Sequence, residues 1–414
     1  MEQSVFPCIN ELIGHFGTPL YLYDFSHITQ QYHALKDEFA ARKSLIAYAL
    51  KANSNLSLVA HLARLGSGAD CVSLGEVKRA LLAGIAPYKI IFSGVGKQEY
   101  EIHEALKIGI LFLNVESEAE LLCVEKVACE LGICARISLR VNPDIDPKTH
   151  PYISTGLSEN KFGVSIDEAK RLYLYAHKSE HLEPVAIHFH IGSQILSLEP
   201  LAQSVQKIAT LLRSLLAIGL PLRFFDVGGG IGIPYKNEQT FALYDYAQMI
   251  LANLSGLDVT IICEPGRFIV ANSGFLVCSV LYEKITQSKR FVIVDGAMND
   301  LLRPTLYQAY HDVMVWRNGW LATDNGTICD VVGPICESGD WLAKDVVLPP
   351  LQSGDLILFK SAGAYGMAMA SNYNSRPRAA EVAFDNMGKI WQIRERESMQ
   401  NLWELELPFL NAQS

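Results

Sequence analysis

Residues that could take part in catalysis or ligand binding follow several short apolar runs in this sequence. They are Lys51 after "SLIAYAL", His188 and His190 in "PVAIHFHIG", Gly228, Gly229 and Gly230 after "LRFFDV", and Glu264, Gly266 and Arg267 in "DVTIICEPGRF". In barrels and open sheets of parallel strands, ligands bind at the carboxyl ends of the strands. If these runs are such strands, the pattern predicts one shared site.

The glycines and Arg267 favour a phosphate site. Backbone N–H groups approach phosphate oxygens closely where no side chain intervenes, and barrels often use late loops of this kind. The segment "GGGIGIP" lacks the G-x-G-x-x-G spacing of a dinucleotide site. Taken alone, three glycines are as typical of a tight turn with no ligand, but Arg267 after the next run makes phosphate the better interpretation.

Lys51 and Glu264 suggest which phosphate compound binds. A single lysine after an apolar run is usually a surface residue, yet a desolvated lysine is a usable amine nucleophile. Pyridoxal phosphate needs both a Schiff-base lysine and a phosphate cradle, and an anion on its pyridine nitrogen makes the ring a stronger electron sink. Glu264 is a candidate for that anion; the alternative is a structural pair with a nearby arginine.

His188 and His190 alternate along their run and are expected to point to one side of a strand. An H-x-H pair can bind zinc, but the neighbouring sequence offers no third ligand, so we predict no metal. A buried core histidine is the alternative for His188. We prefer an interpretation in which His190 packs flat on the cofactor ring.

The segment "GPICESGDWLAKD" places Cys336 beside Glu337 and close to Asp340 in a turn-like setting. A nucleophilic cysteine needs nearby cations to lower its pKa, whereas neighbouring carboxylates disfavour the thiolate. Cys336 is therefore predicted to be a proton donor.

The apolar runs predict the elements that position these residues. Eight strand-like runs alternate with amphipathic helical stretches, at 44–50, 69–73, 89–94, 110–115, 135–141, 184–192, 222–230 and 258–266. This alternation predicts an α/β fold, a (β/α)8 TIM barrel over 25–273. After 274, short strand-like runs predict a mostly β domain, sandwich-like or barrel-like, made of 274–414 and 1–24, with "TPLYLYD" as an extra strand.

Composition excludes several classes of protein. A formal charge of −9 and the lack of a basic patch argue against nucleic acid or an anionic membrane as partner. The first residues do not resemble a secretory signal, and we expect a cytoplasmic protein. Nine cysteines without a C-x-x-C pair, many in runs such as "AELLCVEKVACELGICARISL", are expected to be reduced core thiols.

Longer blocks carry a family resemblance. They are "YALKANSN", "HFHIGSQ", "GGGIGIPY", "EPGRFIV", "DGAMNDLLRPTLYQAYH", "VVGPICESGDWLAKD" and "GAYGMAMASNYNSRPRAAEV". Together they resemble the diaminopimelate decarboxylases, pyridoxal-phosphate enzymes with a barrel and a β domain, akin to ornithine decarboxylase and alanine racemase. The chain departs from the usual pattern in "DGAMND", where "DAGMND" is more common, and at Phe189, where the family often has cysteine.

The resemblance implies a role for each matching position. Lys51 forms the Schiff base, His190 stacks on the ring and Glu264 meets the pyridine nitrogen. Ser193, Gly229, Gly230, Gly266 and Arg267 bind the cofactor's phosphate end. Arg267, Arg303, Tyr307, Glu337 and Tyr365 contact the substrate, and Tyr365 also touches the cofactor. Cys336 is the proton donor, and its loop enters the partner subunit's active site in a homodimer.

The activity implied is decarboxylation of meso-2,6-diaminopimelate to L-lysine and CO2, the last step of lysine biosynthesis. A related decarboxylase of ornithine, arginine or carboxynorspermidine is the main alternative, and it should differ around Arg303 and Tyr307. A racemase is disfavoured by the Cys336–Glu337 loop. A non-catalytic pyridoxal-phosphate-binding homologue would be expected to lack Lys51 or Cys336.

Overall fold

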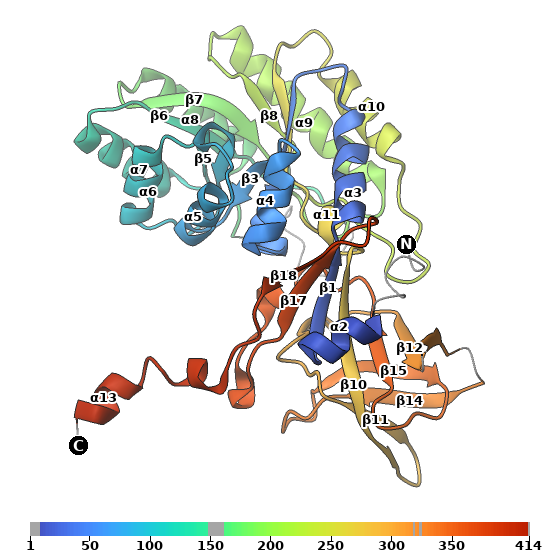
Figure 1. Cartoon of the computed structure of the whole chain (residues 1–414). Coiled ribbons are helices and arrows are strands. Elements are labelled where there is room, and N and C mark those ends of the chain that lie inside the picture. The colour runs from blue at the N-terminus through green and yellow to red at the C-terminus, as the bar shows by residue number, and fades with distance from the viewer. Residues whose placement is uncertain (1–8, 148–160, 318, 323–324, 413–414) are drawn as a thin grey trace. The chain divides into compact units, whose positions relative to one another are not determined.

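The structure, a computed structural model, describes residues 9–147, 161–317, 319–322 and 325–412 (Figure 1). The first residues, expected to carry no secretory signal, and Cys8 lie outside this part. The chain divides into two compact units. The barrel unit comprises 29–234 and 238–269, and the β unit comprises 1–28, 235–237 and 270–414. The predicted boundaries, 25–273 and 1–24 plus 274–414, differ by a few residues and by the segment 235–237.

A closed barrel of parallel strands forms the centre of the barrel unit, which confirms the predicted (β/α)8 fold. The strands are β2 (Ser44–Ala49), β3 (Gly68–Cys71), β4 (Ile90–Phe92), β5 (Phe112–Val115), β6 (Ala135–Arg140), β7 (Leu182–His188), β8 (Phe224–Asp226) and β9 (Thr260–Cys263). The barrel closes where β2 pairs with β9, with Ser44 opposite Ile261. The first and last strands, and the residues that follow them, are therefore neighbours.

Helices alternate with these strands around the barrel (Figure 1). They are α3 (Phe25–Asp37), α4 (Leu56–Arg64), α5 (Leu74–Leu82), α6 (Glu99–Ile108), α7 (Glu118–Leu131), α8 (Ile166–Lys178), α9 (Leu198–Ala217), α10 (Leu243–Asn253) and the short α11 (Arg267–Val270), with 3-10 turns η2 (Leu50–Ala52) and η3 (Pro87–Lys89). The Ser117 side chain accepts a hydrogen bond from Glu120 N at the start of α7, and Gly132 ends that helix with a φ of 65°. Serine at the N-cap and a left-handed glycine at the end satisfy backbone groups that would otherwise lack partners.

A ten-stranded sheet system forms the β unit. Its strands are β1 (Leu20–Asp24), β10 (Gly274–Ile285), β11 (Arg290–Val294), β12 (Val313–Arg317), β13 (Trp320–Leu321), β14 (Thr327–Val332), β15 (Trp341–Leu348), β16 (Leu356–Phe359), β17 (Ala380–Phe384) and β18 (Ile390–Arg394). Strand β1 pairs antiparallel with β10 and parallel with β17. This confirms that "TPLYLYD" joins the later sheet.

Short helices complete the β unit. They are α2 (Ile9–Phe16), α12 (Arg303–Tyr307), α13 (Leu407–Ala412), η5 (Met367–Met369), η6 (Tyr373–Ser375) and η7 (Met399–Leu402). A hydrophobic cluster that includes Leu12, Leu22, Val277 and Leu358 packs α2 against the sheet. Among the described helices, none combines the length and apolar character needed to span a membrane.

The expectation of core cysteines is wrong for the run that suggested it. Cys123 is half-buried, and Cys129 and Cys134 are exposed, although all eight described cysteines are free thiols. The buried stripe of α7 runs through Leu121 and Val124, so its cysteines fall on other faces of the helix.

Candidate active site

Lys51 lies in η2, directly after the first barrel strand. Its Nζ atom is 2.9 Å from Oδ2 of Asp70, at the end of β3. The Lys51 side chain is 38% exposed, whereas that of Asp70 is completely buried. The amine therefore faces accessible space while a buried carboxylate fixes its position.

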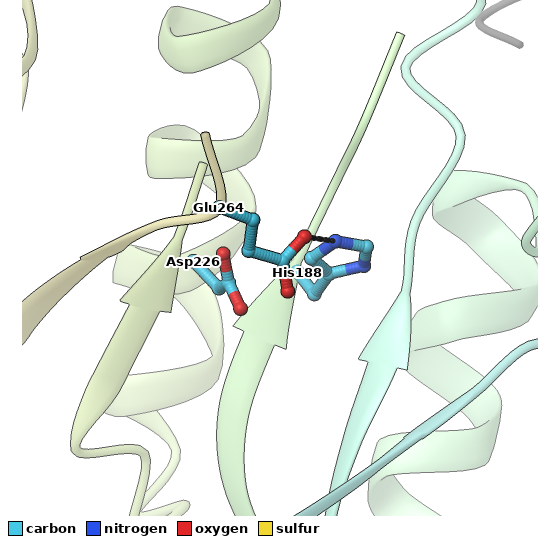
Figure 2. Close-up of side chains that lie close together, drawn as sticks. All are labelled: His188, Asp226 and Glu264. Atoms are coloured by element: carbon cyan, nitrogen blue, oxygen red, sulfur yellow. Dashed lines mark hydrogen bonds and ion pairs between the residues drawn. The ribbon is translucent and has the colours of Figure 1, made fainter. Parts of the chain in front are cut away.

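Glu264 follows β9 and is almost completely buried between His188 and Asp226, at the ends of β7 and β8 (Figure 2). Its Oε2 atom is 3.2 Å from Nε2 of His188. Its Oε1 atom is buried and makes no hydrogen bond with any described residue. This second oxygen is available to a bound group.

The two carboxyl groups differ in acidity. Burial alone would raise the pKa of Glu264, but the nearby His188 and Lys51 outweigh burial and lower it. Burial and the adjacent Glu264 raise the pKa of Asp226 well above its usual value. The lower pKa of the pair therefore belongs to Glu264.

The sequence analysis missed Asp226, and with it the grouping of His188, Asp226 and Glu264. One ligand atom from each of the three lies within 4.8 Å of the others, an arrangement that resembles the donor set of a metal site. His190 is not part of this group, so the H-x-H pair does not form a shared chelate. Each side chain ends a different strand, and the sequence neighbourhood of His188 therefore gave no signal for the cluster.

His190 lies just beyond β7. The Gly229 N–H donates a hydrogen bond of 3.2 Å to Nδ1 of His190, so the ring proton is on Nε2. Burial, followed by the charges of Arg140 and Lys51, lowers the pKa of His190 well below its usual value. A neutral imidazole is suited to packing on an aromatic ring.

The loops proposed to bind phosphate come together within the barrel unit. Arg267 Nη2 donates to Ser193 Oγ at 3.2 Å, and Ile195 N donates to Gly230 O at 2.9 Å. A Cβ atom at Gly229 would lie 2.3 Å from the carbonyl oxygen of Glu264. Only glycine fits there, because the residue is buried between the loops that follow β7 and β9.

Arg303 is buried at the start of α12 in the β unit. Its guanidinium lies 4.5 Å from the ring centroid of Tyr235, and Nη1 is 2.8 Å from Nε2 of His311. His311 Nδ1 is 2.7 Å from the carbonyl oxygen of Lys360, which can only accept a hydrogen bond. The ring proton is thus on Nδ1, and Nε2 accepts from Arg303. The sequence analysis missed both residues that hold Arg303.

Tyr307 and Tyr365 are both half-buried residues of the β unit. Tyr307 is the last residue of α12. Tyr365 follows β16 with a φ of 56°, in the left-handed region that non-glycine residues rarely adopt. Such conformations concentrate at functional sites, which is consistent with the proposed role of Tyr365 in the active site.

Cys336 is exposed in the loop that joins β14 to β15. Its backbone N–H donates to Oδ1 of Asn374, and Tyr373 donates its hydroxyl to Oε2 of Glu337 at 3.0 Å. The "CESGD" loop thus contacts η6 from the "ASNYNSRPR" block.

Asp340 was expected to disfavour the thiolate form of Cys336, but its carboxylate has a structural role. Its Oδ1 accepts from Met298 N and its Oδ2 from Ile335 N, each at 2.7 Å. The carboxylate is buried and fixes the loop backbone. That the Cys336 thiol stays protonated remains a prediction.

Comparison with known proteins identifies the family. The family model "Pyridoxal-dependent decarboxylase, pyridoxal binding domain" matches residues 25–271. Diaminopimelate decarboxylase of Helicobacter pylori strain J99 is 59% identical over 405 residues, covering 97% of this chain and 98% of that protein. The Campylobacter jejuni enzyme of the same name is 56% identical over 403 residues, covering 97% and 99%.

A solved structure agrees with these relatives. The crystal structure of diaminopimelate decarboxylase from Helicobacter pylori complexed with L-lysine has a TM-score of 0.93 and 59% identity, covering 96% of this chain and 99% of that chain. The chain belongs to the diaminopimelate decarboxylase family. The cofactor of this family is pyridoxal 5'-phosphate.

The barrel unit fits this cofactor. A diaminopimelate decarboxylase needs an amine, a phosphate cradle and an anion for the pyridine nitrogen. Lys51 supplies an accessible amine, the glycine loop with Ser193 and Arg267 supplies the cradle, and Glu264 has a buried oxygen that no described residue occupies.

The predicted site residues form two groups, one in each unit. The barrel unit holds Lys51, His190, Ser193, Gly229, Gly230, Glu264, Gly266 and Arg267. The β unit holds Arg303, Tyr307, Cys336, Glu337 and Tyr365. Within the β unit, Thr305 Oγ1 donates to Gly339 O at 2.7 Å, which joins α12 to the Cys336 loop.

Proposed function

We propose that this chain decarboxylates meso-2,6-diaminopimelate at its D centre to give L-lysine and CO2, the last step of lysine biosynthesis. The observation that carries this proposal is the near full-length similarity to the Helicobacter pylori enzyme, whose crystal structure holds L-lysine. L-Lysine is the product expected of the reaction.

The barrel unit is proposed to hold the cofactor. When bound, pyridoxal phosphate supplies an electron sink for the electron pair left on the substrate's α-carbon as CO2 departs. Lys51 binds the cofactor covalently through its amine, and Glu264 keeps the pyridine nitrogen protonated. Ser193, Gly230 and Arg267 hold the phosphate end.

The β unit is proposed to select the substrate and return the proton. Arg303 and Tyr307 bind the distal carboxylate, because a guanidinium offers paired N–H donors that match carboxylate geometry. Glu337 and Tyr365 complete the substrate contacts. Cys336 transfers its Sγ proton to the α-carbon, replacing the bond lost with CO2.

Other decarboxylases of the superfamily form the second candidate. Ornithine and arginine lack the distal carboxylate, so an enzyme for either would have no use for a buried arginine held by Tyr235 and His311. The presence of both Lys51 and Cys336 argues against a non-catalytic homologue.

We further propose that the protein works in the cytoplasm as a homodimer with shared active sites. The family resemblance of the "CESGD" loop supports the dimer. Cys336 and Glu337 are exposed in the single chain, as residues that serve a second subunit would be.

Substrate choice is tested by CO2 release from meso-diaminopimelate, ornithine, arginine and carboxynorspermidine. We expect turnover of meso-diaminopimelate alone, with L-lysine as product. The Arg303→Ala variant should lose at least about tenfold in kcat/KM, the usual range for a charge-assisted hydrogen bond. The exposed Arg64→Ala variant is the control and should match the parent. Equal rates on ornithine or arginine would reject the proposed substrate.

A further inference from the structure

Asp226 has no role in the reaction as described so far, yet it is completely buried beside Glu264 (Figure 2). Its Oδ1 atom accepts a 3.0 Å hydrogen bond from the N–H of Gly228. Its Oδ2 atom has no hydrogen-bond partner in the described part of the chain, and neither has Oε1 of Glu264. Two adjacent buried carboxyl groups thus each have an unsatisfied oxygen.

A single proton shared by the two carboxyl groups would satisfy both of these oxygens. Two carboxylates in contact cannot both ionise in a buried site, whereas one proton turns their repulsion into a hydrogen bond. Glu264 faces His188, and Lys51 further favours its ionised form. Asp226 faces further anions and weak acids, namely Asp70, Cys263 and Tyr246. The proton therefore belongs on Asp226.

We propose that Asp226 is a neutral carboxylic acid that donates a hydrogen bond to Glu264 and, with His188 on the other side, holds it as an oriented carboxylate toward the cofactor's pyridine nitrogen. Asp226 is a positioning residue, since it acts through Glu264. The inference rests on the proposed role of Glu264. The raised pKa of Asp226 and the lowered pKa of Glu264 agree with this placement of the proton.

The neutral acid makes the Asp226→Asn variant informative. An asparagine amide donates to Glu264 as the acid does, and its oxygen still accepts from Gly228 N. The substitution should leave the site intact, because the native side chain carries no charge. Asp226→Leu removes the donor and leaves Glu264 supported by His188 alone.

Infrared difference spectroscopy of the holoenzyme tests the proton directly. Parent minus Asp226→Asn should show the C=O stretch of a protonated carboxylic acid, and a carboxylate band in its place would overturn the proposal. Titration with pyridoxal phosphate should give nearly parental affinity for Asp226→Asn and roughly tenfold to hundredfold weaker binding for Asp226→Leu. Equal losses in both variants would also overturn it.

Two further measurements separate the possible failures. The nitrogen-15 signal of labelled cofactor should report a protonated pyridine nitrogen in the parent and in Asp226→Asn, but not in Glu264→Gln. An unchanged signal in Glu264→Gln would reject the role of Glu264, whatever the infrared result for Asp226. If Asp226→Leu does not fold, the infrared band and the Asp226→Asn titration still decide the proposal.

Discussion

Arg303 shows how one proposed substrate-binding side chain is held by its neighbours. Tyr235 lies against the guanidinium face, and His311 accepts one of its N–H bonds. The Tyr235 and His311 rings also meet edge to face, with centroids 5.6 Å apart. The guanidinium therefore has a fixed plane before any substrate arrives, and less conformational entropy is lost on binding.

The His311→Phe variant should raise KM for meso-diaminopimelate about tenfold, because Arg303 loses the acceptor that orients it. Cofactor affinity should not change, since the barrel unit holds the cofactor. His311→Gln should recover much of the loss, because its amide can accept from Arg303 and donate to Lys360 O. Steady-state kinetics of the three proteins, with the exposed His177→Phe as control, measure the effect. An unchanged KM in His311→Phe would show that His311 does not orient Arg303 for substrate binding.

At the residue scale, the sequence singles out candidate reactive side chains more readily than the side chains that support them. Lys51, His190 and Glu264 stand out because polar residues follow apolar runs. Asp226 lies inside such a run, and its significance depends on Glu264, which the pairing of β8 with β9 brings near. Asp340 was misjudged for a related reason, since sequence proximity to Cys336 does not reveal that backbone N–H groups hold its carboxylate.

The conformation and packing of the loop after β8 restrict which residues its sequence can contain. Gly230 has a φ of 104°, and Gly229 lies too close to the Glu264 backbone to carry a side chain. The loop can therefore present its backbone to a ligand only while these positions remain glycine.

A methyl group at Gly229 tests this limit. Gly229→Ala should lower the free energy of unfolding by about 1–3 kcal/mol, as for other overpacked sites, and weaken pyridoxal phosphate binding. Gly96→Ala is a matched control, because a Cβ at Gly96 meets nothing within 4 Å. Chemical denaturation and cofactor titration measure the two effects. Parental cofactor affinity in Gly229→Ala would show that the loop does not contact the cofactor.

The sequence predicted the barrel strands more completely than those of the β unit. Each barrel strand is a short run that is buried on both faces, and such near-continuous apolar runs are readily recognised in a sequence. The strand-like runs recognised after 274 were "FLVCSVLYEKI", "RFVIVDG", "DLILFK", "AEVAFD" and "KIWQIRE", so strands β12 to β15 were missed. In β15 the pattern is broken by Lys344 and Asp345, which are exposed on a strand that is only partly covered.

At the scale of the whole molecule, the proposed functional groups are divided between two units of one chain. The proposed cofactor residues other than Tyr365 belong to the barrel unit, and the proposed proton donor belongs to the β unit. In the proposed homodimer, Cys336 of one subunit serves the cofactor of the other.

Mixing two inactive variants tests this arrangement. Lys51→Ala lacks the cofactor amine, and Cys336→Ala lacks the proton donor. After random exchange, half of the dimers are mixed and each has one complete site, so activity should return to about one quarter of the parental value. Each variant mixed with itself is the control. If mixing restores nothing while mixed dimers form, Cys336 does not serve the partner.

Closure of the barrel also has a consequence for biosynthesis. Lys51 follows the first barrel strand, and Glu264 follows the last, which pairs with the first. A nascent chain that has emerged only as far as β8 lacks Glu264 and cannot close the ring. Given the proposed roles of Lys51 and Glu264, we expect stable capture of pyridoxal phosphate during synthesis only after the barrel is complete, and so after the early strands have paired.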